Sequence, residues 1–165
     1  MGTVPALSAR AVAAEAYRDA ISHHPAGVAI VTAADGNAPV GMTVSTVTSH
    51  SVAPPTLSCD LALDSATLAV IRSTGGYAIH LLAEDQTDLA VRFAARATDR
   101  FAGTGWWRWH GLPVLPGVLA RFACELHTDI EIGDHALVLG TVVDLDVDPT
   151  RRPLVHHRRG FHSVR

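Results

Sequence analysis

The clearest pattern of apolar and polar residues lies in the last third of the chain. From residue 118 to residue 132 the even positions are mostly apolar, whereas many odd positions are charged or polar. Such alternation predicts a long strand with one buried face. Gly133–Asp134 follows as a two-residue turn, and residues 135–147 form a second strand-like run. The segment therefore predicts a long antiparallel hairpin.

Shorter patterns upstream predict further strands and three helices. Apolar, β-branched runs at residues 28–34, 39–52, 56–63 and 77–82 indicate strands, with a turn at residues 35–37. The apolar spacing from Leu7 to Ile21 predicts a helix. A second helix over residues 66–73 is capped by Asp64 or Ser65, and a third runs from Asp85 to about Ala95. This many strands favours a closed barrel, with the helices capping it or packing outside.

Composition narrows the class of protein. The 165 residues predict one domain, with a core at about residues 14–165 and residues 1–10 as a flexible N-terminal extension. A net charge of −3 gives no basic field for nucleic acid. No apolar run reaches the roughly 20 residues of a membrane helix, and no signal peptide is evident. All thirteen basic residues are arginine, which excludes lysine-based chemistry. With two distant cysteines, we expect a cytoplasmic protein without nucleic-acid or membrane partners.

Candidate chemistry is carried by small hydroxyl residues rather than by a known catalytic motif. Residues 43–49 form a hydroxyl-rich run, Ser58–Cys59–Asp60 lies on the next strand, and Ser65–Ala66–Thr67 opens a helix. Small side chains leave room for a flat ring, and a helix N-terminus suits a phosphate. A plain barrel wall would carry the same residues, so both interpretations stay open. The histidine clusters lack the partners of a metal site. The tryptophans at residues 106–109 are either a stacking platform or a packed loop or interface.

Further short segments follow one another in a specific order: residues 17–20, 27–32, 41–46, 49, 51, 54–55, 65–67, 93–94, 99–101, 111–115, 124–125, 133–135 and 153–155. This order resembles the flavin reductase-like family, whose FMN-binding split barrels are reductase components of two-component flavin monooxygenases. The resemblance implies a mostly β split barrel with flanking helices that forms a homodimer. It also implies reduction of FMN or FAD by NADH or NADPH, with transfer of reduced flavin to a partner monooxygenase. The alternative is a split-barrel flavoprotein that retains FMN for electron transfer or as a carrier.

The resemblance also assigns site residues. In this family the flavin ring lies against the strands matching Thr43, Val44, Ser45, Thr46, Ser58, Cys59 and Asp60. The phosphate is held by Ser65, Thr67 and a nearby arginine, Arg100, and Phe93 belongs to the same flavin site. His135, His157 and Arg158 lie toward the nicotinamide, although His156 replaces a usual aromatic residue.

The mechanism expected for these residues needs no nucleophile, because flavin accepts the hydride. Backbone amides near residues 58–60 would stabilise negative charge on the ring. His135 would position the nicotinamide or supply a proton, or it would only hydrogen-bond across the turn before it. The pairs Arg151–Arg152 and Arg158–Arg159 would receive the dinucleotide's phosphates, or they belong to a solvated tail.

Overall fold

The computed structural model describes residues 11–96 and 99–164, so the expected extension at residues 1–10 lies outside the described residues. The helices are α1 (Ala14–Ser22), α2 (Ala66–Thr74) and α3 (Thr87–Ala94). The strands of the main sheet are β2 (Ala29–Asp35), β3 (Ala38–Val44), β4 (Thr48–Val52), β5 (Pro55–Ala62), β6 (Gly76–Leu81), β9 (Ala120–Ile132) and β10 (His135–Val147). The shorter strands are β1 (Ala26–Gly27), β7 (Trp107–Trp109), β8 (Leu112–Val114), β11 (Leu154–His157) and β12 (Gly160–Ser163).

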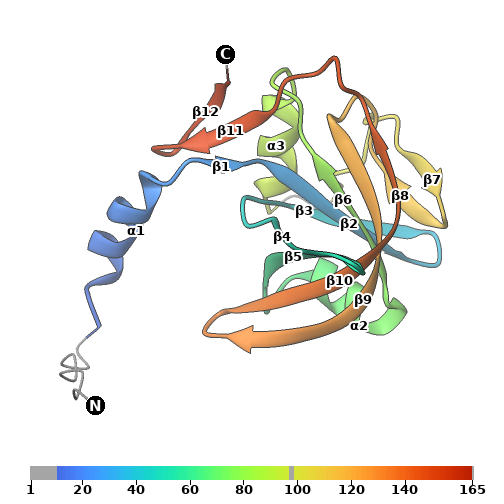
Figure 1. Cartoon of the computed structure of the whole chain (residues 1–165), viewed down its shortest axis with the longest axis horizontal. Coiled ribbons are helices and arrows are strands. Elements are labelled where there is room, and N and C mark those ends of the chain that lie inside the picture. Colours follow the sequence, from blue (N-terminus) through green and yellow to red (C-terminus); the bar gives the residue numbers. More distant parts are fainter. Residues whose placement is uncertain (1–10, 97–98, 165) are drawn as a thin grey trace.

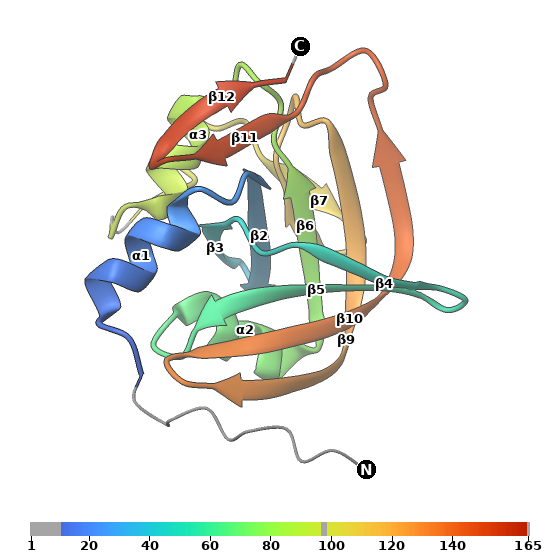
Figure 2. The same cartoon turned by 60° about the vertical axis from the view of Figure 1, so that its left-hand side comes forward.

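The main sheet has seven antiparallel strands in the order β3-β2-β6-β9-β10-β5-β4. The predicted long hairpin is confirmed, since β9 and β10 pair along almost their whole length around the Gly133–Asp134 turn. Two register shifts in this hairpin strengthen its bend, and the sheet curls on itself (Figure 2). The Asp60 amide on β5 donates to Oγ1 of Thr46, which lies between β3 and β4, over 2.8 Å. The expected mostly β split barrel is therefore confirmed.

Helix α2 closes part of the barrel interior. Its first turn is capped by Ser65, whose Oγ accepts from the Leu68 amide at 3.2 Å, so Ser65 rather than Asp64 is the cap. Gly75 ends the helix in the left-handed conformation, with φ of 76°. Leu68 and Ile71 are buried in the same core cluster as the inward side chains of the sheet. Capping therefore sets the length of the helix, and burial of one face holds it in place.

Helix α3 and the segment after it cover the outer face of β2 and β3. Ala90 and Phe93 are fully buried, and they pack in a second cluster with Val28, Ile30 and Phe101. The rings of Phe93 and Phe101 meet edge to face, with centroids 5.0 Å apart. Because both faces of β2 are buried, its run of apolar residues is continuous rather than alternating.

The single strand expected over residues 39–52 is two strands, β3 and β4, separated at residues 45–47. β3 pairs with β2, whereas β4 pairs with β5 on the other side of the sheet. The chain must therefore cross from one edge of the sheet to the other between β3 and β4. Residues rich in Val and Thr favour extended backbone on both sides of this crossing, so the local pattern does not mark it.

The helix expected from Leu7 begins only at Ala14, and Leu7 lies outside the described residues. No side chain of α1 is buried, and Tyr17 and Ile21 are 58% and 49% exposed. Figure 1 shows α1 standing away from the barrel. Its apolar face is therefore not part of the core of this chain. Within residues 11–96 and 99–164, no helix has the length and apolar character needed to cross a membrane.

The tryptophan segment forms a small hairpin of β7 and β8. The Arg121 guanidinium lies 4.8 Å from the ring centroid of Trp107, and Trp106 packs edge to face on Phe101 at 5.7 Å. These contacts favour the packed-loop interpretation. Sequence patterns missed this hairpin because each of its strands has only three residues.

Candidate functional site

Three clefts of the structure adjoin one another through shared lining residues. The α2–α3 cleft, of about 600 Å³, is lined by Pro39–Thr43, Ala62, Asp64–Thr67, Phe93, Ala94, Arg96, Arg100 and Phe101. The central cleft, of about 670 Å³, is lined by Tyr17, Val28, Met42–Thr46, Asp60, Ala94, Ile132, Asp134, His135, Leu137, His156 and Phe161. The α1 cleft, of about 1110 Å³, is lined by Glu15, Tyr17, Arg18, Ile21, Ser22, His24–Gly27, Ser45–Thr48, Asp60, His156 and Arg159. Neighbouring clefts share residues, so they form a continuous path.

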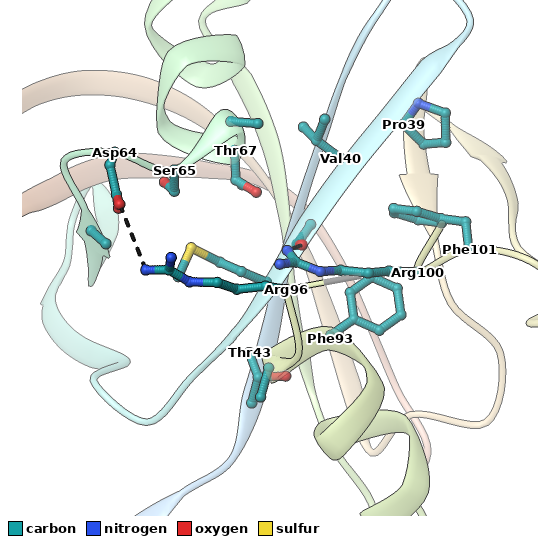
Figure 3. A pocket seen from close by; sticks show the side chains of 15 residues that line it. Pro39, Val40, Thr43, Asp64, Ser65, Thr67, Phe93, Arg96, Arg100 and Phe101 are labelled. Atoms are coloured by element: carbon teal, nitrogen blue, oxygen red, sulfur yellow. Dashed lines mark hydrogen bonds and ion pairs between the residues drawn. The ribbon is translucent and has the colours of Figure 1, made fainter. Parts of the chain in front are cut away.

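The α2–α3 cleft has the chemistry of an anion site. The N-terminus of α2 opens into it, and Ser65 and Thr67 line it from this end (Figure 3). Backbone amides at a helix N-terminus attract negative charge. Arg96 and Arg100 approach from the opposite side (Figure 3). Two guanidinium groups facing a helix N-terminus suit a phosphate.

The two arginines of this cleft differ in how firmly they are held. Arg100 donates from Nε to the Ala95 carbonyl at 2.9 Å and from Nη1 to the Gly41 carbonyl at 2.5 Å, so its guanidinium is fixed by the backbone. Arg96 lies 4.0 Å from Asp64, and its side chain is 97% exposed. Sequence reasoning predicted Arg100 and missed Arg96. The available signal was its place in the same arginine-rich segment after α3.

The central cleft is a mostly apolar slot beside the break between β3 and β4. Its predicted residues Thr43, Val44, Ser45 and Thr46 all line the slot. Thr43 Oγ1 donates to the Ala90 carbonyl at 2.7 Å, and Thr46 Oγ1 accepts from the Asp60 amide. Ser45 makes no side-chain hydrogen bond to the part of the chain that the structure describes. Ser45 is therefore the hydroxyl in this run best placed to meet a ligand.

His135 lines the central cleft and lies directly after the β9–β10 turn. Its Nδ1 lies 2.7 Å from Asp134 Oδ1, and this hydrogen bond is the main reason that the pKa of Asp134 is lowered. Because Nδ1 donates to the carboxylate, Nε2 is the ring nitrogen left for a ligand. Both expectations for His135 are thus compatible: it bonds to the turn and it faces the cleft.

His156 faces the same slot and extends into the α1 cleft. Its ring packs edge to face on Phe161, with centroids 5.6 Å apart. His156 stands where the family usually has an aromatic residue. Phe161, on the neighbouring strand β12, therefore supplies part of the aromatic surface at this position. Tyr17 and Phe161 line the cleft although sequence reasoning did not select them as site residues.

Four expected site residues lie outside the lining of these clefts. Cys59 points into the barrel core, where burial raises the pKa of its thiol, because neighbouring side chains of a strand face opposite sides. Ser58 is buried and hydrogen-bonded to His50 Nε2 at 2.6 Å. The His157 carbonyl accepts from the His162 ring at 3.2 Å. Arg158 donates from Nε to a ring nitrogen of His23 at 3.3 Å.

One of the expected charge-stabilising amides on β5 is already hydrogen-bonded within the chain. The Asp60 amide donates to Thr46 Oγ1 over 2.8 Å. β5 pairs with β10 over residues 56–62 and with β4 over residues 55–58, so many of its backbone groups belong to the sheet ladders. The side chain of Asp60 lines the clefts, and the charge-stabilising role of the amides near residues 58–60 stays a prediction.

Comparison with known families shows to which family this chain belongs. The model described as "Flavin reductase like domain" matches residues 21–165. The chain belongs to the flavin reductase-like family. Its relatives include the actinorhodin polyketide dimerase of Streptomyces coelicolor, which is 41% identical over 149 residues, covering 89% of this chain and 84% of that protein.

Two further similar proteins of this family have names that describe reductases. HsaB, the reductase subunit of a flavin-dependent monooxygenase from Rhodococcus jostii, is 32% identical over 160 residues, covering 96% of this chain and 82% of that protein. The NADH:FAD oxidoreductase SgcE6 of Streptomyces globisporus was solved in complex with NAD and FAD fragments. It superposes with a TM-score of 0.84 at 28% identity, covering 88% of this chain and 89% of that chain.

Proposed function

We propose that this flavin reductase-like protein is an NAD(P)H:flavin oxidoreductase that reduces FMN or FAD. The observation that carries the proposal is the continuous path of clefts. A cleft with two arginines and a helix N-terminus adjoins a mostly apolar cleft that His135 also lines. This order matches a phosphorylated planar molecule with a second planar ring beside it. The names of the relatives support the same reaction.

In the proposed reaction both flavin and NAD(P)H are substrates. A hydride leaves C4 of the dihydronicotinamide and forms a bond to N5 of the flavin, while a solvent proton is taken up at the flavin ring. Two electrons pass to the flavin, and the nicotinamide becomes the oxidised cation. The chain's task is to hold the two rings in contact. Ser45 and the slot walls would receive the flavin ring, Arg96 and Arg100 its phosphate, and His135 Nε2 the nicotinamide carboxamide.

The reduced flavin would then pass to a partner flavin-dependent monooxygenase in the cytoplasm. HsaB supports this role, since its name describes one subunit of a monooxygenase. Slow release of flavin would instead favour the alternative, a flavoprotein that retains FMN for electron transfer or as a carrier.

We also infer a homodimer. The end of β10 exposes Val143, Leu145 and Val147, each at 50–53%, and the opposite end of the β9–β10 hairpin, beside its turn, exposes Ile130 and Ile132. Exposed apolar side chains grouped in this way at each end of the hairpin are typical of an interface. Light scattering after gel filtration tests this inference, and a monomeric mass at micromolar concentration would contradict it.

The test of the reaction is oxidation of NADH and NADPH by purified protein without flavin, with FMN and with FAD. Turnover that requires added flavin supports the proposal and identifies both preferences. A yellow protein that shows no NAD(P)H oxidation under any condition would overturn the proposal in favour of the retained-flavin alternative.

Two variants test the placement of the substrates. Ser45→Trp should abolish flavin reduction with the fold intact, because the indole would fill the slot, whereas Ser73→Trp on the exposed surface of α2 should remain active. His135→Ala should raise KM for NAD(P)H or lower kcat more than it changes KM for flavin. Unchanged flavin affinity in the first variant, or unchanged kinetics in the second, would remove that residue from the site.

A further inference from the structure

Asp60 is held at the wall of the central cleft by the strand to which it belongs. Its neighbours on β5, Cys59 and Leu61, are buried in the barrel core, so the side chain of Asp60 faces the other side of the strand. Its partner across the ladder with β10 is Leu137, and both residues line the central cleft. The Asp60 amide is bonded to Thr46 Oγ1. At this residue the carboxylate is therefore the group left for a ligand.

The charge of this carboxylate is not neutralised by a neighbouring side chain. Asp134, the other carboxylate of the central cleft, is hydrogen-bonded to His135 at 2.7 Å. Arg18 and Arg159 line the α1 cleft, which Asp60 also borders. Within residues 11–96 and 99–164, neither arginine pairs with Asp60, and no arginine lines the central cleft. Asp60 therefore brings an unpaired negative charge to the slot where the flavin ring is proposed to lie.

A charge at the ring and a charge at the phosphate act differently on the two redox forms of flavin. The phosphate is the same in both forms, so Arg96 and Arg100 bind them equally and do not favour either one. The oxidised ring is neutral, whereas the reduced ring readily loses its N1 proton near neutral pH and becomes an anion. A negative group beside the ring therefore repels reduced flavin selectively. Asp60 lies on this side of the path, since it borders the slot with Ser45 and Thr46.

Resting on the proposed function, we propose that Asp60 weakens the binding of reduced flavin relative to oxidised flavin and so promotes release of the product. At the effective dielectric constant of a partly buried site, one unit charge several ångströms from the ring changes the dissociation constant about tenfold. Because binding and reduction are linked, each tenfold preference for the oxidised form lowers the two-electron potential of the bound flavin by about 30 mV. A reduced flavin that leaves the site is available to a second protein.

The test measures binding of FMN in both redox forms without NAD(P)H. Asp60→Asn removes the charge and keeps the size of the side chain and the backbone bond to Thr46. Equilibrium dialysis with oxidised FMN, and with photoreduced FMN in the absence of oxygen, gives the two dissociation constants. The variant should bind reduced FMN about tenfold more tightly, with unchanged affinity for oxidised FMN, and the potential of its bound flavin should rise by about 30 mV. Asp88→Asn, which removes the same charge from the exposed first turn of α3, should change neither constant.

Two results would overturn the proposal: an unchanged affinity of Asp60→Asn for reduced FMN, or an equal change for both redox forms, which would indicate a structural effect. The outcome is separable from that of the proposed function. A protein that oxidises no NAD(P)H but shows the selective change loses the proposed function and keeps the role of Asp60. An active reductase without the selective change refutes the role of Asp60 alone, and a protein that binds neither form of FMN refutes both.

Discussion

Burial of His80 should make the stability of the protein depend on pH. The side chain lies on β6, is fully buried, and has Nδ1 3.0 Å from the Ile30 carbonyl. The Leu115 amide donates to Nε2 at 3.3 Å. Nε2 therefore carries no proton, and the neutral ring links two strands to the segment before β9. Protonation would place an N–H group against the Leu115 amide and a charge in the core.

The structure sets both the sign and the size of this effect. Burial, the largest cause, lowers the pKa of His80 from 6.5 to about 4. Between these pH values the unfolded chain binds more protons than the native protein, so stability is full above the unfolded pKa and is lost as pH falls toward 4. At about 1.4 kcal/mol for each tenfold change in proton affinity, the contribution is about 3 kcal/mol.

The assay is urea unfolding at several pH values from 7.5 to 4.5, followed by tryptophan fluorescence. His80→Gln cannot titrate in this range, so the difference in unfolding free energy between wild type and this variant isolates the histidine from titrating carboxylates. This difference should shrink by about 2–3 kcal/mol as the pH falls. His127→Gln, at an exposed position on β9, should follow the wild type. A wild-type-to-variant difference that stays constant across this range would refute the reasoning.

Three further substitutions test the barrel and the anion site. Gly140→Ala should destabilise the protein by about 1–3 kcal/mol in urea, because the new Cβ would overlap Tyr77 and lie 2.9 Å from a backbone carbonyl. Thr46→Val should cost about 1–2 kcal/mol by leaving the Asp60 amide without its acceptor, and Thr46→Ser should restore most of this in the same urea assay. Ser65→Asp keeps a side chain that caps α2, so the free energy of unfolding should not change. The new carboxylate should repel the phosphate and raise KM for FMN at least about tenfold. An unchanged KM would place the phosphate elsewhere.

Several elements were predictable because their signals are local. Ser65 and Gly75 cap α2 through backbone groups only a few residues away. The Gly133–Asp134 turn joins strands whose alternating pattern is visible in the chain itself. The resemblance to a family added the order of these elements, and with it the split barrel and an expected flavin site.

Of the residues expected in the site, some line the clefts and others do not. Ten of the expected residues line the clefts, and their contact with flavin or nicotinamide stays a prediction: Thr43–Thr46, Asp60, Ser65, Thr67, Phe93, Arg100 and His135. Cys59 does not, because the register of β5 turns it into the core while Asp60 faces the cleft. Register depends on pairing with β10 and β4, which no short stretch of chain specifies.

Local chain chemistry was sufficient for the caps, the turns and most strands, because those features are made by neighbouring residues. The crossing at residues 45–47 depends instead on which strands β3 and β4 pair with. Arg18 and Arg159 meet at one cleft only because the β11–β12 hairpin packs on the end of α1. Contacts between distant segments arise only when the barrel closes and the hairpin packs, so the tertiary structure decides which polar side chains share a site.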